Sequence, residues 1–287
     1  MLRIALPNKG RLSEEALELF ETAGLRADFT SSRALMAKMG PDYQAIFVRA
    51  SDIPEFVADG AADVGVTGHD LVVESDRDVT ELFDLGFGRC RLSVAIPESR
   101  GIDSVDDLPA GTRVATSFPG ITTRFFAERG IDIEIAKVSG AAEIAPHLGV
   151  ADVIVDLVST GSTLRVNRLA EIQTIVESTA RMVANVDALE DPTLRRKIDR
   201  LVTALESVLR ARKKRYLMAN VPRMKLDQVR EIVPGMNGPT VVDVMDADEW
   251  VAVHVVVDED RVFDTISELK EIGAAGILVS RIERLTP

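Results

Sequence analysis

The sequence is short of cysteine, aromatic residues and long apolar runs, and each shortage excludes a class of protein. Cys90 is the only cysteine among the 287 residues, which excludes an intrachain disulfide and a multi-cysteine metal site. Aromatic residues make up 5% of the chain, so Val, Ile, Leu and Ala must form most of the core. The chain has no run of about 18 apolar residues, so it is not expected to cross a membrane. Its start leads directly into a strand-like pattern without the apolar segment of a secretory signal, and we therefore expect a cytoplasmic protein.

Positive charge is also scarce, with 34 Lys and Arg against 46 Asp and Glu and a formal net charge of −12. Nucleic acids and acidic membranes are bound by clustered Lys and Arg, so the chain is not expected to bind either. A small anionic ligand is still compatible with this charge, because a local group of cations and backbone amides can hold phosphate in an acidic protein. The basic run Arg210–Arg215 is short and lacks aromatic residues, and we interpret it as the solvated end of a helix.

Strand and helix patterns alternate through the first two thirds of the chain, which predicts α/β units with largely parallel sheets. A first helix is expected to be capped by Ser13, and a long helix follows Asp191-Pro192. The segment Tyr216–Pro287 has the order β-α-β-β-α-β of a ferredoxin-like domain, whose exposed sheet face or edges could join copies of the chain. Strands before that segment are predicted at Leu2–Leu6, Ile46–Arg49, Val64–Thr67, Leu92–Ile96, Arg113–Thr116, Ile133–Val138, Val153–Asp156 and Ile172–Val176.

A short repeat links two of these strands. Ala62-Asp63-Val64 and Ala151-Asp152-Val153 each follow a helix-like segment and each lead to a turn that contains glycine. The repeat is either a coincidence of common residues or the trace of two similar lobes that face a cleft. The matching context slightly favours the two lobes.

The stretch VIVDLVSTGSTLRVNRL at Val153–Leu169 is the most informative motif. An apolar strand carries Asp156 to its end, and a run of small residues follows where a helix begins (Ser159, Thr160, Gly161, Ser162, Thr163). The free N–H groups of that first turn and the hydroxyls suit a phosphate monoester, and Gly161 permits a left-handed conformation. A helix cap would need one hydroxyl, so we favour an anion site over a bare turn. The carboxylate of Asp156 could accept hydrogen bonds from ribose hydroxyls.

This loop resembles the phosphoribosyl pyrophosphate (PRPP) loop of phosphoribosyltransferases, and the whole chain resembles the long form of ATP phosphoribosyltransferase. The segments that carry the resemblance are LRIALPNKGRLSEEALELFETAG, DVGVTGHDLVVES, FPGITTRFFAERG, GVADVIVDLVSTGSTLRVNRL and IGAAGILVSRIE. The resemblance implies a two-lobed, periplasmic-binding-protein-like α/β catalytic core and a C-terminal ferredoxin-like (ACT-like) regulatory domain. We expect lobe I to comprise residues 1–90 and 178–213, lobe II residues 91–177, and the regulatory domain residues 214–287.

The resemblance also implies roles for individual residues in the synthesis of N1-(5-phosphoribosyl)-ATP and pyrophosphate, the first step of histidine biosynthesis. Mg²⁺ is expected to arrive on substrate phosphates, without direct protein ligands. Feedback inhibition by L-histidine and a hexameric or dimeric homo-oligomer are implied as well. The PRPP site is expected at Glu143, Asp152, Asp156, Ser159, Thr160, Gly161, Ser162, Thr163 and Leu164; ATP or pyrophosphate at Lys9, Gly10, Arg11, Arg49, Gly68, Asp70 and Leu71; and histidine around Asn220, Thr240 and Ala275.

This reaction asks little of acid–base catalysis, because adenine N1 already carries a lone pair and pyrophosphate leaves as an anion. Positioning, with Lys9, Arg11 and Arg49 as its agents, and charge stabilisation should therefore supply most of the rate. His147 and His254 are interpreted as structural, and His69 is a weaker candidate for substrate contact.

Two rival interpretations remain open from the sequence. Thr123-Arg124-Phe125 reproduces a signature of prephenate dehydratase, but a dehydratase gives no reason for the hydroxyl-rich loop. A small-molecule sensor or solute-binding protein could use the same scaffold. The chain has neither an export signal nor a helix-turn-helix segment before its first strand, and both absences weigh against that alternative.

Overall fold

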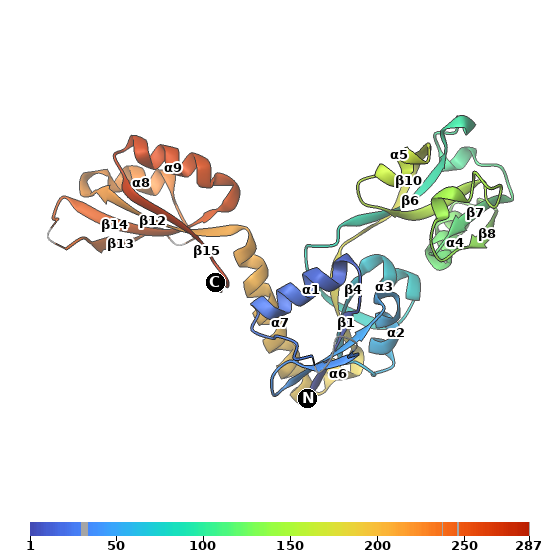
Figure 1. Ribbon diagram of the computed structural model, residues 1–287, viewed down its shortest axis with the longest axis horizontal. Coiled ribbons are helices and arrows are strands. Elements are labelled where there is room, and N and C mark those ends of the chain that lie inside the picture. The colour runs from blue at the N-terminus through green and yellow to red at the C-terminus, as the bar shows by residue number, and fades with distance from the viewer. Residues whose placement is uncertain (30–33, 237, 246, 287) are drawn as a thin grey trace. The chain divides into compact units, whose positions relative to one another are not determined.

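The computed structural model describes residues 1–29, 34–236, 238–245 and 247–286, and their strands form three separate sheets (Figure 1). Contacts divide the chain into two compact units, residues 1–18 with 25–199 and residues 19–24 with 200–287. The first unit contains two of the sheets, which we call lobe I and lobe II after their strands, and the second unit contains the third sheet. Within the described residues, no helix is both long and apolar enough to span a bilayer.

Lobe I is built on a sheet with the strand order β2-β3-β1-β4-β11-β5, in which β1 is parallel to both β3 and β4. Its core includes Ala5, Ile53, Val57, Ala62 and Val183. The elements of lobe I are β1 (Leu2–Pro7), α1 (Arg11–Thr22), β2 (Met36–Lys38), β3 (Tyr43–Val48), η1 (Ala50–Asp52), α2 (Ile53–Ala58), β4 (Val64–Gly68), α3 (His69–Ser75), β5 (Val79–Asp84), β11 (Ala180–Asn185) and α6 (Val186–Glu190).

Helix α1 begins at Arg11, three residues before the start that a cap at Ser13 predicts. Ser13 lies inside the helix, and its backbone N–H donates to the carbonyl of Gly10 at 3.0 Å. Gly10 has a left-handed φ of 82°, which turns the chain from β1 directly into the helix. The cap expected at Ser13 is therefore wrong, because the turn at Gly10 already starts the helix.

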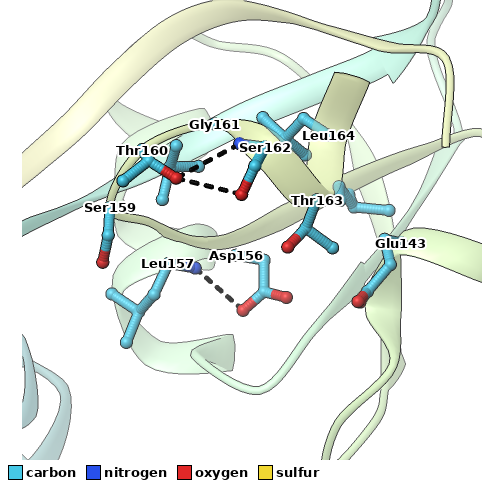
Figure 2. A pocket seen from close by; sticks show the side chains of 11 residues that line it. Glu143, Asp156, Leu157, Ser159, Thr160, Gly161, Ser162, Thr163 and Leu164 are labelled. Atoms are coloured by element: carbon cyan, nitrogen blue, oxygen red, sulfur yellow. Dashed lines mark hydrogen bonds between the residues drawn. The ribbon is translucent and has the colours of Figure 1, made fainter. Parts of the chain in front are cut away.

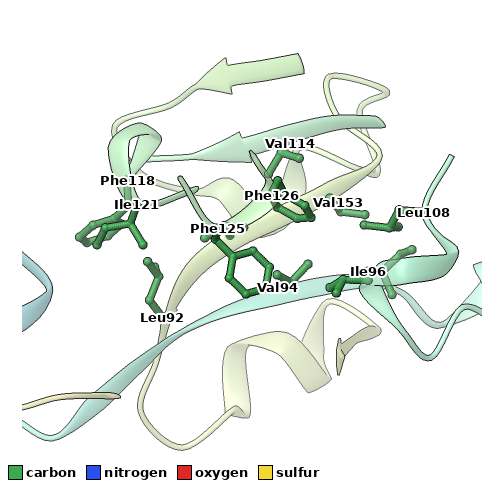
Figure 3. Close-up of a cluster of buried hydrophobic side chains, with 12 residues drawn as sticks. Leu92, Val94, Ile96, Leu108, Val114, Phe118, Ile121, Phe125, Phe126 and Val153 are labelled. Carbon is green, nitrogen blue, oxygen red and sulfur yellow. The ribbon is translucent and has the colours of Figure 1, made fainter. Parts of the chain in front are cut away.

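Lobe II has the strand order β10-β6-β9-β7-β8, with β7, β8 and β9 parallel to one another and β6 antiparallel to β9. Large side chains cover one face of its sheet: Phe118, Phe125 and Phe126 pack against β6, β7 and β9 (Figure 3). The elements of lobe II are β6 (Cys90–Pro97), η2 (Glu98–Arg100), η3 (Val105–Asp107), β7 (Thr112–Thr116), α4 (Pro119–Glu128), β8 (Ile133–Lys137), η4 (Ala142–Ile144), β9 (Val153–Val158), α5 (Ser162–Val166) and β10 (Leu169–Ser178).

The other face of the lobe II sheet carries small side chains. Ala95, Ala115 and Ala136 lie on three strands of this face and pack with Ile154 and Leu164. Alanine leaves room close to the sheet, so η4 and α5 can approach it and bring their loops together. This is the face on which the candidate site is built.

The long helix α7 (Pro192–Arg212) begins after Asp191 as predicted, in the first unit, and its residues from 200 onward belong to the second unit. The Asp191 carboxylate accepts from the backbone of Thr193 and Leu194. The second unit also contains the third sheet. Its antiparallel sheet has the order β13-β14-β12-β15, and the order β-α-β-β-α-β confirms the predicted ferredoxin-like fold. Alternate residues of β12 and β14 are buried with Val229 and Leu269 of its helices. The elements are β12 (Lys214–Pro222), η5 (Arg223–Lys225), α8 (Leu226–Ile232), β13 (Thr240–Asp243), β14 (Trp250–Asp258), η6 (Glu259–Arg261), α9 (Val262–Glu271) and β15 (Ala275–Arg281).

Candidate functional site

The hydroxyl-rich loop lines a cavity of about 360 Å³ at the end of β9 in lobe II. Figure 2 shows the side chains of Asp156, Thr163 and Glu143 around this cavity, with the turn at Thr160–Ser162 above them. The lining residues are Glu143, Ile154, Asp156, Leu157, Val158, Ser159, Thr160, Gly161, Ser162, Thr163 and Leu164.

The shape of the loop is fixed by a left-handed glycine and by hydrogen bonds within the loop and from α5. Gly161 has a φ of 71°, a left-handed conformation that residues with a side chain rarely adopt, and it starts α5. The hydroxyls of Thr160 and Ser162 lie 3.0 Å apart, and the Arg165 guanidinium donates to the Thr160 carbonyl at 3.4 Å. The sequence therefore concentrates hydroxyl groups in a turn that opens onto the cavity.

The carboxylates of Asp156 and Glu143 reach the same cavity from different elements. Asp156 lies on β9, and Glu143 lies on η4, which follows β8. Burial raises the pKa of the Asp156 carboxyl and the nearby Glu143 charge raises it further, while a hydrogen bond from the Leu157 N–H, at 2.8 Å, lowers it. Ala141, just before η4, has a left-handed φ of 51°, which is uncommon for a residue with a side chain. This arrangement suits a ligand that carries hydroxyl donors next to an anionic group.

Asp152, which was expected at the PRPP site, lies at the opposite end of β9. Its carboxylate accepts from the Arg100 guanidinium at 2.5 Å and from the Arg113 backbone N–H at 3.0 Å. These hydrogen bonds lower the pKa of Asp152. The structure does not bring Asp152 to the cavity, because the acid stands where the strand begins and the loop stands where it ends.

In lobe I, the residues expected to contact ATP follow three parallel strands whose carboxyl ends meet at one sheet edge. Lys9 and Gly10 follow β1, Arg49 follows β3, and Gly68 ends β4 before Asp70 and Leu71. Two hydrogen bonds tie these segments together: Asn8 N–H to the Val48 carbonyl at 2.8 Å, and Thr67 Oγ1 to the Ala50 carbonyl at 2.7 Å. Arg11 begins α1, but its side chain lies outside the described part of the structure.

Asp70 turns its carboxylate into the protein. The residue is 4% exposed, and its carboxylate accepts from the Ser178 hydroxyl at 2.5 Å, while its own N–H donates back to that hydroxyl at 3.1 Å. Burial raises the pKa of the Asp70 carboxyl, and the bond from Ser178 opposes that rise. Next to it, His69 Nδ1 lies 2.8 Å from Glu81 Oε1. The Asp70 side chain is thus used within the fold.

Sequence reasoning missed a polar network beside the loop. Arg91 and Ser93 of β6 both bond to Glu171 of β10. The available signal was the placement of polar residues at alternate positions of an otherwise apolar strand, which puts both on one face.

The residues expected to bind histidine lie on three strands of the third sheet. Asn220 of β12 pairs with Ala275 of β15, whereas Thr240 lies on β13, which pairs with β14. Thr240 lines a separate cavity of about 380 Å³, in which Tyr216 Oη and His254 Nδ1 share a hydrogen bond. The structure brings Asn220 and Ala275 together and leaves Thr240 apart from them.

Residues of the rival signature serve the fold. Arg124 of the Thr-Arg-Phe signature donates to the Val73 carbonyl at 2.6 Å, and Phe125 is buried in the lobe II core.

His147 Nε2 lies 2.7 Å from the Asn167 carbonyl oxygen. Within the described ranges, no group of three or more His, Cys, Asp or Glu residues could hold a metal ion.

Comparisons with known proteins agree over both parts of the chain. Residues 49–207 match the family model described as ATP phosphoribosyltransferase, and residues 211–284 match the model described as HisG, C-terminal domain. The chain is 59% identical to the ATP phosphoribosyltransferase of Gemmatimonas aurantiaca and 52% identical to that of Natronomonas pharaonis, each over 100% of both chains. Among solved structures it resembles the ATP phosphoribosyl transferase (HisG:HisZ) complex from Thermotoga maritima, with a TM-score of 0.66 and 30% identity over 73% of this chain and 99% of that one.

Proposed function

Because the chain belongs to the ATP phosphoribosyltransferase family, we propose that it joins ATP to PRPP in the first step of histidine biosynthesis. The products are N1-(5-phosphoribosyl)-ATP and pyrophosphate. The observation that carries this proposal is the lobe II cavity, where a hydroxyl-rich turn and the carboxylates of Asp156 and Glu143 share one space. A phosphorylated sugar carries both an anionic group and hydroxyl donors, and so complements both halves of the cavity.

PRPP occupies this cavity in the proposal. The hydroxyls and backbone amides of Thr160–Thr163 hold its 5′-phosphate, and Asp156 with Glu143 accepts hydrogen bonds from the ribose hydroxyls. Charge-assisted hydrogen bonds of this type are stronger than neutral ones. Asp152 contributes by fixing the start of β9 through Arg100 and Arg113, and does not touch the ligand.

ATP binds at the lobe I edge in the proposal. Lys9 and Arg49 supply positive charge, Gly10 and Gly68 permit close approach of the backbone, and Leu71 offers an apolar contact to the base. Arg11 joins this set by its place in the sequence, at the start of α1. Asp70 supports the edge from inside by its bonds with Ser178.

The reaction follows from this placement. The lone pair of adenine N1 attacks the anomeric carbon of PRPP, the bond from that carbon to the pyrophosphate oxygen breaks, and the electron pair leaves with pyrophosphate. No proton has to be removed from N1 first, so the protein acts by orienting the reactants and stabilising charge. A cavity with the carboxylates of Asp156 and Glu143 fits a Mg²⁺ ion held mainly by substrate oxygens, and bound Mg²⁺ would neutralise charge on the departing pyrophosphate.

The second unit serves regulation and assembly in the proposal. L-Histidine binds near Asn220, Thr240 and Ala275 and inhibits the enzyme, and copies of the chain associate into a dimer or hexamer. The helix-free face of the sheet supports assembly, because Val242 and Leu278 on it are 49% and 61% exposed. The matched Thermotoga maritima structure is itself a complex.

The assay that tests the function follows the absorbance of N1-substituted adenine with ATP, PRPP and Mg²⁺ present. We expect product together with equimolar pyrophosphate, and inhibition by L-histidine that is lost when residues 214–287 are removed. Thr160→Ala should raise KM for PRPP about tenfold and leave KM for ATP unchanged, because one hydrogen-bond donor to an anion is lost. Absence of product at every Mg²⁺ concentration would refute the proposed activity.

A further inference from the structure

We propose that the ion pair between Arg91 and Glu171 is a positioning device for the PRPP loop, which sets the direction of the loop's backbone amides without touching the ligand. The inference rests on the proposed function of that loop. Neither Arg91 nor Glu171 lines the cavity, so a contact with bound PRPP is not what their placement supplies.

The pair is built on the same sheet face as the site. In the register of β6 with β9, Arg91 lies opposite Val158 and Ser93 lies opposite Asp156. Directly opposed residues of an antiparallel pair extend to the same face, so Arg91 and Ser93 share the face of Asp156. Arg91 is therefore the strand neighbour of the residue immediately before the loop.

Glu171 holds the Arg91 guanidinium in one orientation. Its two carboxylate oxygens each accept from Arg91 at 2.5 Å, and the hydroxyls of Ser93 and Thr174 donate to the same carboxylate at 2.7 Å and 3.3 Å. A bidentate arginine–carboxylate pair fixes the plane of the guanidinium as well as its position. The remaining nitrogen of Arg91 donates to the Ser159 carbonyl at 3.5 Å.

The effect on the loop follows from peptide geometry. In a trans peptide the C=O and the next residue's N–H point in opposite directions. Arg91 holds the Ser159 carbonyl and Arg165 holds the Thr160 carbonyl, so the Thr160 N–H points away from Arg91 and the Gly161 N–H points away from Arg165. These are backbone groups of residues that line the cavity. An anion site needs its carbonyls turned outward, and the two arginines perform that task.

The test compares Arg91→Gln and Glu171→Gln with Arg77→Gln as the matched control. Arg77 makes a pair of the same type with Glu55, at 2.6 Å and 2.5 Å, in lobe I. We expect both Arg91→Gln and Glu171→Gln to raise KM for PRPP about tenfold, with KM for ATP and the melting temperature changed no more than in the control. The double variant should be no worse than Arg91→Gln alone, because the pair acts as one unit. Methylguanidinium added to Arg91→Ala should restore KM for PRPP.

Two results would overturn the inference. If Glu171→Gln left KM for PRPP unchanged or lowered it while Arg91→Gln raised it, Arg91 would be contacting the ligand directly. If both variants lost stability beyond the control without changing KM for PRPP, the pair would be merely structural. Failure of the proposed function is seen separately, as absence of product with the unaltered protein or an unchanged KM for PRPP in Thr160→Ala.

Discussion

Lobe I and lobe II share a strand order and differ in how one equivalent strand ends. The order β3-β1-β4-β11-β5 of lobe I corresponds to β8-β7-β9-β6-β10 of lobe II, with the first three strands parallel in each. The repeated Ala-Asp-Val therefore marks the same position in both lobes, the start of β4 and of β9. A comparison of the two lobes therefore distinguishes the residues that stabilise the fold from those that line the cavity.

The aspartate of the repeat stabilises the fold in both lobes. Asp63 accepts from the Arg3 N–H at 2.7 Å and from its guanidinium at 2.6 Å, and its own N–H donates to the Arg3 carbonyl. Asp152 makes the corresponding two hydrogen bonds with the backbone N–H and carbonyl of Arg113, and its carboxylate also accepts from the guanidinium of Arg100. Each acid pins the start of its strand to the parallel neighbour, which is a role in stability.

The strand that follows the repeat ends differently in the two lobes. β9 of lobe II ends in a turn that opens onto a cavity, where Asp156 is partly buried but lines the space. β4 of lobe I leads to Asp70, whose carboxylate is closed off by Ser178. The same topology thus carries two different carboxylates. We call Asp156 of lobe II, which lines the cavity, an open acid, and Asp70 of lobe I, which is buried against Ser178, a sealed acid. Substitutions at these acids and at their neighbours test that difference.

The largest effect is expected for Asp156→Asn. The loss of a charged acceptor for the ribose hydroxyls should lower kcat/KM for PRPP about 100-fold. The melting temperature should stay level or rise, because burial makes the ionised Asp156 costly to the folded state. Steady-state kinetics with either substrate varied and thermal denaturation measure both effects. A variant with normal PRPP kinetics would show that the open acid has no ligand role.

The aspartates at the strand starts should show the opposite behaviour. Asp63→Asn should cost about 1–3 kcal/mol of unfolding free energy, because a buried acceptor of charged hydrogen bonds is weakened. Asp152→Asn should cost about 0–1 kcal/mol, since its partner pair is partly exposed. The double variant should show additive losses, because the sites have no shared partners. Urea unfolding measures these energies.

Two controls belong with these variants. KM for PRPP should stay within about twofold in both, as for substitutions away from the site. The pKa of Asp152 is lowered in the folded state, so its contribution is present above the usual aspartate range and is lost as pH falls through the folded pKa. A PRPP defect in Asp152→Asn equal to that of Asp156→Asn would place Asp152 at the ligand after all.

A smaller effect is expected in the pH profile of Glu143→Gln. Asp156 must be ionised to accept from ribose, and its raised pKa makes kcat/KM for PRPP fall with decreasing pH sooner than an ordinary aspartate would. Removing the Glu143 charge lowers that pKa, so the variant should lose a smaller share of its activity than the unaltered chain as the pH falls below neutrality, although its activity starts a few-fold lower. Thr160→Ala is the control, because it keeps the charges of Asp156 and Glu143, and because any titration of PRPP itself affects this variant in the same way.

The sequence predicted the parts of the two lobes that depend on local patterns. The strand β9, its hydroxyl-rich loop and the order of the ferredoxin-like unit are local signals of alternation and turn residues. The strands β5 and β11 were not predicted, because β5 mixes apolar with charged residues and is half-buried, and because β11 pairs with segments far away in the chain. The partners of Asp152, Asp70 and Arg91 lie 39 to 108 residues away, so their roles emerge only from the fold.

The smallest effect is expected for Asp70→Asn, and it tests whether the lobe I strand end is sealed. An asparagine oxygen can still accept from Ser178, so the fold should be kept. The folded pKa of Asp70 is raised, so the stability that its protonated form contributes is fully present below the unfolded pKa and is lost as pH rises through the folded pKa. The variant has no such loss, and its melting temperature should exceed that of the unaltered chain by about 2 °C at pH 8 and by less at pH 5. KM for ATP should change less than about twofold. A tenfold rise in KM for ATP without this pH dependence would mean that Asp70 faces substrate, and that both lobes present an open acid at the same strand end.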